Sequence, residues 1–181
     1  SGSMLLSVNM SESKDNIKHY LAQKEYKGVK IPQITDITLI LDEMERVVKG
    51  VKGLSNVQSN RNFDDFVFSF SGDFTDVEVL NNAVDALSTE MAKRSPMGQV
   101  PTVKDNYHYT KGNFHRLFDY PIDTELYGKL GFMEQFMLEN ARLVGIYKFP
   151  TTIKNQSNTK AEVSPSKKAV TLPRAGILHS Q

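Results

Sequence analysis

Hydrophobic and polar residues alternate along two early segments of the chain, which is the pattern of a half-buried β-strand. Residues 4–10 alternate in this way. Residues 66–71 do so more strongly, because Phe66, Phe68 and Phe70 alternate with smaller side chains. We predict a strand in each segment, the second with its aromatic face turned inward.

Four other segments have apolar residues three and four positions apart, which is the spacing of one helix face. We predict helices in residues 14–25, 37–53, 75–94 and 123–141. Residues that cap helices precede or open each segment: Ser11 or Ser13, then Asp36, then a capping box of Thr75 and Glu78, and finally Asp123 or Thr124. Gly53 is predicted to end the second helix.

The last two predicted helices should each bury one stripe of apolar side chains. In residues 75–94 the stripe consists of Val77, Leu80, Val84, Leu87 and Met91. In residues 123–141 it consists of Leu126, Leu130, Met133 and Met137. Residues 26–33 contain Gly28 and Pro32 and are predicted to form a loop.

Two alternating runs flank Lys111 and Gly112, which predicts a β-hairpin with a positive φ at the glycine. One arm is expected to carry Tyr107 and Tyr109 on one face. The other arm is expected to carry Phe114, Arg116 and Phe118 on one face. Further along, residues 141–153 predict a long strand that Pro150 confines to an edge, a bulge or the strand end.

Two shorter strands are predicted at residues 161–163 and 169–172, around a turn in the sequence SPSKK. Hairpins next to one another favour an α+β fold, a mostly antiparallel sheet with helices packed on one face. The 181 residues suit one domain, which we place at residues 4–173 with a tail at 174–181. Ser-Gly-Ser before Met4 is typical of a cloning remnant, and the natural amino terminus with any export signal would then have been removed.

Composition and charge exclude several classes of function. A net charge of +1 gives no electrostatic reason for nucleic-acid binding. The sequence has no apolar run of about 18 residues, so it predicts no membrane-spanning helix. Cysteine is absent, which excludes disulfides, thiolate metal sites and cysteine nucleophiles. Phosphate-binding glycine loops and serine-hydrolase motifs are absent as well, so we expect no cofactor.

The histidines offer one candidate for chemistry. His108 and His115 lie on opposite arms of the predicted hairpin and could approach each other. With Asp105 or Asp119 they could form a metal site or an acid/base pair of a hydrolase. The alternative is that both are polar residues on a solvent-facing strand surface, which the alternation requires whatever the function. We favour this alternative and predict no metal site.

The carboxylates and aromatic residues are also open to two interpretations. Asp64 and Asp65 are neighbours that should point to opposite faces of a strand, so they are not expected to act as a catalytic pair. The aromatic face of the hairpin could bind a glycan, peptide or acyl chain, or it could belong to the core. We take it as a candidate ligand-binding set made of Tyr107, Tyr109, Phe114, Arg116 and Phe118.

Residues 140–172 carry a series of motifs that permits a comparison with a known family. The motifs are Phe149-Pro150, Ile153, Ser157-Asn158, Ala161 to Val163, Lys167-Lys168 and Val170 to Leu172. In this order they resemble the closing unit of uncharacterised Bacteroidetes envelope lipoproteins, which are distantly similar to LppM-like domains. Residues 4–13 and 64–87 resemble the front of those proteins more weakly. The sequence SPSKK stands where that family commonly has an Asp-Gly turn.

The resemblance implies an exported, non-enzymatic domain in the periplasm or on the cell surface. It would be tethered to the outer membrane through a lipidated cysteine that precedes Met4 in the natural protein. Its partner would be an envelope protein, or an apolar or lipid ligand, since LppM-like domains are similar to lipid-binding folds. Two alternatives remain: the hydrolase on the histidine hairpin, and a structural subunit of an envelope complex.

Overall fold

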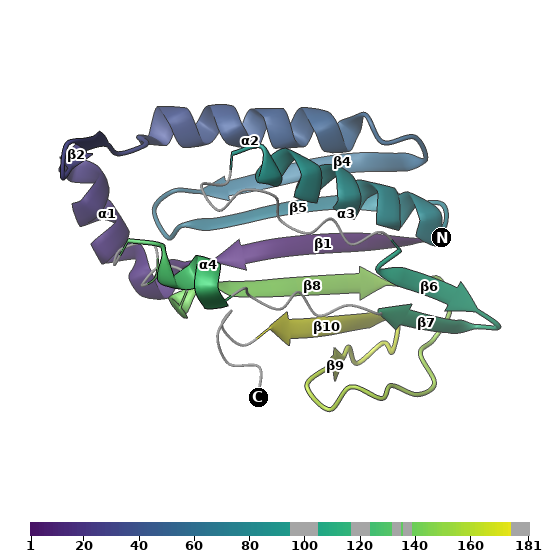
Figure 1. The fold of residues 1–181 in the computed structure, drawn as a ribbon. Helices are drawn as coiled ribbons and strands as arrows, with labels where there is room; N and C mark the ends of the chain where they lie inside the picture. Colours follow the sequence, from purple (N-terminus) through teal and green to yellow (C-terminus); the bar gives the residue numbers. More distant parts are fainter. Residues whose placement is uncertain (95–104, 117–123, 132–134, 136–138, 175–181) are drawn as a thin grey trace.

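The structure, a computed structural model, describes residues 1–94, 105–116, 124–131, 135 and 139–174 (Figure 1). It confirms the α+β fold with a large, antiparallel sheet and its helices on one face. Six strands form this sheet in the order β4-β5-β1-β8-β10-β9. Their bounds are β1 (Gly2–Asn9), β4 (Leu54–Asn62), β5 (Val67–Phe74), β8 (Arg142–Lys148), β9 (Glu162–Val163) and β10 (Ala169–Arg174).

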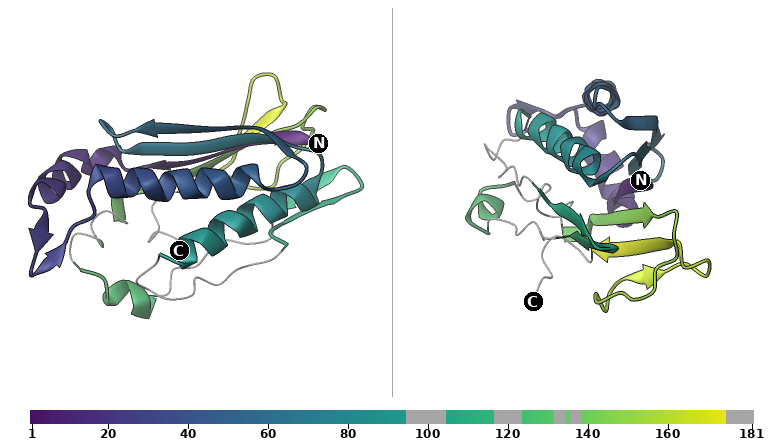
Figure 2. Two further views of the ribbon diagram at one scale, coloured as in Figure 1. Left: turned by 90° about the horizontal axis from the view of Figure 1, so that it is seen from above. Right: turned by 90° about the vertical axis from the view of Figure 1, so that its right-hand side faces the viewer.

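Helices and two small hairpins make up the rest of the described structure. The helices are α1 (Lys14–Ala22), which follows a 3-10 turn at Ser11–Ser13, α2 (Ile34–Lys49), α3 (Val77–Ala92) and the short α4 (Thr124–Gly128). The hairpins are β2 (Glu25–Tyr26) with β3 (Val29–Lys30), and β6 (Tyr107–Thr110) with β7 (Asn113–Arg116). Figure 2 shows α2 and α3 lying side by side on the same face of the sheet.

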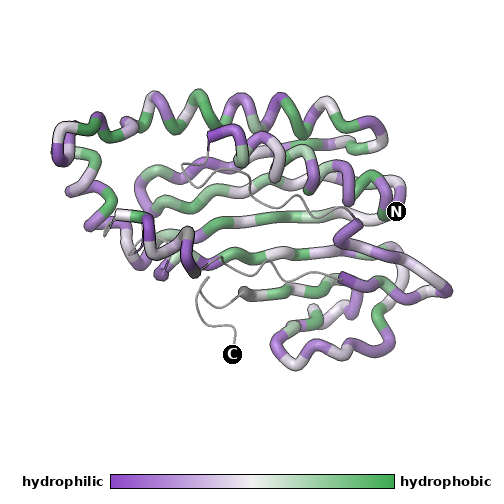
Figure 3. The backbone as a smooth tube through the Cα atoms, in the orientation of Figure 1, coloured by the Kyte–Doolittle hydropathy of each residue, from purple (hydrophilic) through white to green (hydrophobic). Residues whose placement is uncertain are grey.

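Hydrophobic side chains of the sheet and of the two long helices meet in two clusters. The larger cluster joins Met4 of β1 and Tyr147 of β8 to Leu80 and Val84 of α3. The smaller one joins Leu41 and Val48 of α2 to Phe70 of β5 and Leu87 of α3. Each turn of α2 has hydrophilic and hydrophobic residues, as expected for a helix with one buried side (Figure 3).

Helix α1 starts at Lys14 as predicted, but the starts of α2 and α3 differ from those predicted because other residues provide the caps. Helix α2 begins at Ile34, with Gln33 as N-cap, and Asp36 lies inside its first turn, where it accepts a 2.8 Å hydrogen bond from the Gln33 backbone N–H. Helix α2 ends at Lys49, so Gly53 lies in the following turn and does not end the helix.

Helix α3 is capped by Asp76, whose carboxylate accepts from the Val79 backbone N–H at 3.0 Å, and Thr75 precedes that cap. At α1, Ser13 is the N-cap residue but makes no side-chain capping bond.

The buried stripe of α3 is turned slightly from the predicted one. Leu80, Val84 and Leu87 are buried as expected. The stripe also includes Val79 and Ala83, and Met91 at its end is 56% exposed. In the fourth predicted helix, α4 covers only Thr124–Gly128, while Met133 and Met137 lie outside the described residues.

Two pieces of strand structure were not predicted. The expected loop at residues 26–33 contains β3, which pairs with β2 through a turn with positive φ at Lys27 and Gly28. Strand β4 is a long edge strand whose register shifts between Ser55 and Gln58. A β-bulge of this kind breaks the alternation of side chains, so the polar sequence of β4 shows no period of two.

The carboxy-terminal strands form where predicted, but β8 is shorter than the predicted strand at residues 141–153. Strand β8 ends at Lys148, and Pro150 lies just beyond it. The SPSKK turn connects β9 to β10, with Lys167 at a φ of 54° and its backbone N–H bonded to the Ser164 carbonyl at 2.8 Å. At the other end of the chain β1 begins at Gly2, two positions before the predicted domain start. Most of the predicted tail lies outside the described residues.

Candidate functional site

The β6–β7 hairpin forms as its sequence predicts. Lys111 and Gly112 both have positive φ, at 51° and 83°, which is the geometry of a two-residue type I′ turn. The turn places Tyr107 opposite Arg116, Tyr109 opposite Phe114 and His108 opposite His115. Directly opposed residues of an antiparallel pair lie on the same face. One face of the hairpin is therefore aromatic, and the other carries the two histidines.

The aromatic face packs against the sheet. Tyr107 is only 4% exposed, and its ring centroid lies 5.5 Å from that of Tyr147 on β8. The two hydroxyl oxygens are 2.6 Å apart. Phe114 stacks on Tyr107 and makes an edge contact with Phe149 at 5.0 Å between centroids. Tyr107 and Phe114 thus join the hairpin to the core.

The other members of the predicted ligand-binding set are placed differently. Tyr109 is 57% exposed near the hairpin turn. Arg116 is half-buried on the opposite arm. Phe118 lies outside the described residues. Within the described hairpin, Tyr109 is the aromatic residue of the set that offers most of its ring to a ligand.

Asn81 of α3 fixes the position of the hairpin. Its side-chain nitrogen donates to the Tyr107 carbonyl, and its side-chain oxygen accepts from the Tyr107 backbone N–H, each at 2.9 Å. One amide therefore satisfies both backbone groups at the start of β6, as a neighbouring strand would. Sequence reasoning missed this role, because nothing local distinguishes Asn81 from Asn82 next to it.

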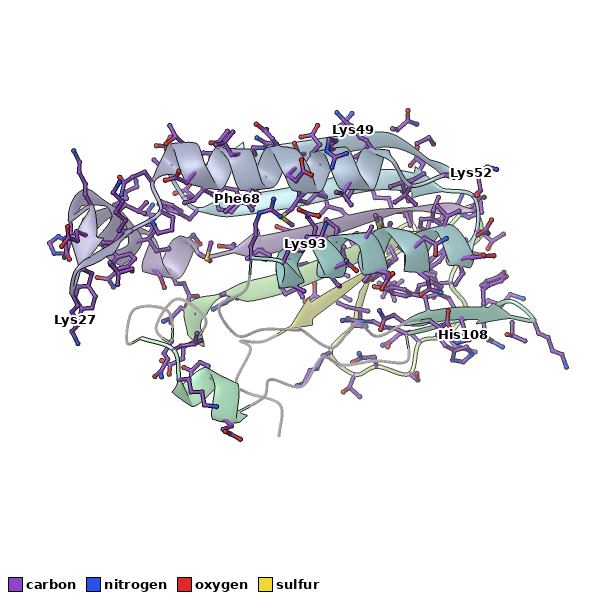
Figure 4. The ribbon with its side chains drawn as sticks, turned by 45° about the horizontal axis from the view of Figure 1, so that its top comes forward. Lys27, Lys49, Lys52, Phe68, Lys93 and His108 are labelled. Carbon is purple, nitrogen blue, oxygen red and sulfur yellow. The ribbon has the colours of Figure 1, made fainter. Side chains whose placement is uncertain are left out.

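The structure brings His108 and His115 together as a directly opposed pair, and both are exposed. In Figure 4 His108 projects from the hairpin on the side away from the sheet. Asp105 is exposed just before β6, and Asp119 lies outside the described residues. Among the described residues there is no group of three or more His, Cys, Asp or Glu side chains placed to hold a metal ion.

Of the two carboxylates singled out from the sequence, Asp65 has a structural partner, and so does Glu90, which the sequence did not single out. Asp64 and Asp65 lie in the turn between β4 and β5 and not in a strand as predicted. Asp65 forms a 2.9 Å ion pair with Lys14 of α1. Glu90 is buried on α3, where Arg94 and then Lys93 lower the pKa of its carboxyl. A general acid needs the opposite shift, so Glu90 is held as a structural anion.

A cluster of charged residues links α2 to the edge strand β4. Arg61 of β4 contacts Asp42 at 2.6 Å and Glu45 at 2.9 Å, and Lys49 approaches Glu45 to 2.6 Å. The side chains of Glu45 and Arg61 are only 21% and 20% exposed. Hydrogen bonds from Lys49 and then Ser59, with the charges of Lys49 and Arg61, lower the pKa of Glu45 to about 2.

Replacing Glu45 with glutamine should make the free energy of unfolding depend less on pH in the acid range. Because the pKa of Glu45 in the folded protein lies below its ordinary 4.5, the anion stabilises the fold above about pH 4.5. This stabilisation is lost as the pH falls toward 2. We expect Glu45→Gln to cost about 1–2 kcal/mol at pH 7, allowing for solvent screening, and progressively less below pH 4.5. Urea unfolding at several pH values measures the difference.

Glu43→Gln is the matched control for this prediction. Glu43 bonds to Arg46 on the same helix, and the Arg46 side chain is 71% exposed. The cost of Glu43→Gln should therefore be smaller than that of Glu45→Gln at neutral pH. Equal costs for the two variants would show that Glu45 contributes no more than an ordinary surface pair.

The face of the sheet opposite α2 and α3 is the second candidate site, and we call it the helix-free face. Strand alternation and register assign to it Ser3, Leu5, Ser7 and Asn9 of β1, Val67, Ser69, Ser71 and Asp73 of β5, Gln58, Asn60 and Asn62 of β4, and Arg142, Val144, Ile146 and Lys148 of β8. No helix among the described residues covers this face (Figure 2). It is therefore an open surface of the described part of the chain.

The centre of the helix-free face is uncharged. Leu5 lies between Ser71 and Ile146 in one row, and Ser7 lies between Ser69 and Val144 in the next. All six of these side chains are half-buried by their neighbours. The charged side chains Asp73, Arg142 and Lys148 lie at the strand ends. An apolar patch bordered by small hydroxyls, with charges at its margin, resembles the core and rim of a protein interface.

A cavity of about 390 Å³ lies at the end of the sheet where β1 begins. Its walls include Phe74 and Phe149, together with Asp73 and Lys148. Asp73 also accepts a 2.7 Å hydrogen bond from Asn56. The mixture of charges and backbone groups in these walls does not suit an acyl chain.

Comparisons with known proteins identify no relative of this chain. No protein-family model matches it, and no match was found among curated proteins or solved structures. No described helix is long and apolar enough to cross a membrane. The lipoprotein resemblance therefore stays a prediction, and inferences about function depend on the geometry of the two candidate sites.

Proposed function

We propose that this chain is a non-enzymatic binding domain of a bacterial envelope lipoprotein and that it binds a partner protein through its helix-free face. The observation that carries the proposal is the uncharged centre of that face, around Leu5, Val144 and Ile146. A soluble face with no partner usually carries charged residues along its strands. Here the central positions hold aliphatic and hydroxyl side chains only, and the charges lie at the margin.

A protein partner fits this surface better than a lipid does. Lipid-binding folds hold their ligand in an enclosed apolar space. In this chain the space between the sheet and the two long helices is filled by the two hydrophobic clusters. The cavity at the end of the sheet has charged walls. A flat, neutral face suits the flat contact between two proteins.

The proposed location in the cell envelope depends on the resemblance of residues 140–172 to envelope lipoproteins. It predicts that the natural gene encodes a signal peptide and a cysteine shortly before Met4. Sequencing the gene upstream of this codon tests the location separately from the binding surface. A gene with neither feature would contradict the envelope location and leave the helix-free face to be tested on its own.

A lysine placed in the centre of the helix-free face should weaken partner binding without unfolding the domain. We choose Val144→Lys, because the aliphatic part of lysine can stay on the sheet while its charge disrupts an apolar contact. We expect partner affinity to fall at least about tenfold, as for truncation or disruption of a central interface residue. The measurement is cross-linking and co-purification from the native envelope, followed by native mass spectrometry of the complex.

Leu39→Lys on α2 is the matched control, since Leu39 is 66% exposed and lies outside the helix-free face. Thermal unfolding of both variants checks that each domain is folded. A partner recovered equally with the Val144→Lys variant would contradict the proposed surface. A bound lipid in place of a protein would contradict the proposed partner, and a fixed subunit ratio would favour a structural role in a complex.

A further inference from the structure

The histidine face of the β6–β7 hairpin is not used by the proposed function. His108 and His115 are directly opposed in register, and both side chains are exposed. Directly opposed residues have Cβ atoms about 4.5–5.5 Å apart. Two imidazoles that start at this separation can converge their ring nitrogens on one point above the hairpin.

The hairpin holds this pair in a fixed register. The type I′ turn at Lys111 and Gly112 closes the hairpin at one end. The amide of Asn81 binds both backbone groups of Tyr107 at the other end. The opposite face is anchored by Tyr107 and Phe114 in the aromatic contacts with β8. A one-residue slip would expose these rings, so the register of the two histidines is strongly specified.

Two imidazole side chains at this separation could bind one metal ion. Zn–N bonds are about 2.0–2.1 Å long, so two imidazole nitrogens on one tetrahedral ion lie roughly 3.3 Å apart, within reach of converging rings. Imidazole suits Zn²⁺, Ni²⁺ and Cu²⁺, whereas Mg²⁺ and Ca²⁺ prefer oxygen ligands. The other described strand positions that share this face are Thr110 and Asn113, and neither carries a positive charge.

In place of the solvent-facing role that we favour from the sequence alone, we propose that His108 and His115 form a two-imidazole site for a late first-row divalent cation such as Zn²⁺ or Ni²⁺. The described residues provide no third His, Cys, Asp or Glu ligand. The remaining coordination positions are therefore filled by water or by a group from a partner. The site is an exposed, exchangeable one, unlike the closed four-ligand sites that hold structural zinc.

Titration of the untagged chain with ZnCl₂ and NiCl₂ tests the proposal. Isothermal titration calorimetry should give saturable binding of one ion per chain. Either His108→Gln or His115→Gln should weaken it at least about tenfold, because the second imidazole binds intramolecularly in the intact pair. Bound metal should raise the midpoint of thermal unfolding in the original chain.

Two control variants separate the pair from histidine content alone. His19→Gln removes an exposed histidine on α1 and should leave metal binding unchanged. The double variant His115→Gln with Asn113→His keeps two histidines on this face but places them diagonally, where α-carbons are about 7–8 Å apart. It should bind as weakly as His115→Gln alone. Binding that survives both single hairpin variants, or no saturable binding in the original chain, would overturn the proposal.

Discussion

Replacing Tyr147 with alanine is expected to lower the free energy of unfolding by about 3–5 kcal/mol, the usual cost of deleting a buried aromatic side chain. Tyr147 is 1% exposed at the centre of the sheet and contacts both Tyr107 and Phe114 of the hairpin. Its loss removes the ring on which the hairpin rests and leaves a cavity beneath it. Urea denaturation should show a lower midpoint.

Tyr147→Phe separates the ring from its hydroxyl. This variant keeps the ring and removes only the hydroxyl that lies 2.6 Å from the Tyr107 hydroxyl. We expect it to cost about 1 kcal/mol, the net value of a typical hydrogen bond. If Tyr147→Phe destabilised the protein as much as Tyr147→Ala, the hydroxyl pair and not ring packing would be the main stabilising contact.

Gly53→Ala should destabilise the protein almost as strongly, with an expected cost of about 2–5 kcal/mol from backbone strain and overpacking together. Gly53 has a φ of 89°, where an L-residue is strained by roughly 1–2 kcal/mol. A Cβ at this position would also lie 2.6 Å from a methyl carbon of the buried Val79. Overpacking of this kind adds about 1–3 kcal/mol. Thermal and urea unfolding measure the sum.

Gly28→Ala isolates the contribution of backbone strain. Gly28 has a similar φ of 78°, but nothing lies within 4 Å of a Cβ built there. Its substitution should therefore cost only the conformational strain. Equal costs at Gly28 and Gly53 would contradict the proposed clash with Val79.

Much of the fold follows from local sequence patterns. The alternating phenylalanines of β5, the Lys-Gly turn of the second hairpin and the proline after β8 each act over a few residues. Strand β4 was not predicted, because its bulge disrupts the alternation and its residues are mostly polar. The caps of α2 and α3 lie elsewhere than predicted, because Gln33 opens α2 with Asp36 bonded back to its backbone N–H, and Asp76 caps α3 in place of Thr75.

Less of the candidate sites could be predicted from the sequence. The pairing of His108 with His115 follows from the turn between them, so the sequence could suggest it. The helix-free face could not be predicted, because it depends on which distant strands become neighbours. Nothing in the local pattern of β1 indicates that Leu5 lies beside Ile146. The pair of hydrogen bonds between Asn81 and the Tyr107 backbone likewise depends on contact between elements far apart in sequence.

The position of β1 has a consequence for how the protein reaches its folded state. Leu5 pairs with Ser71 on one side and with Ile146 on the other, so the middle of the sheet is completed only when a late segment of the chain arrives. Pairings of such long sequence separation form slowly. A chain that crosses a membrane before folding must avoid early collapse. This order of strands delays the pairing of β1 with β8 until β8 has emerged, which would suit translocation of the chain before it folds if the domain is exported as we propose.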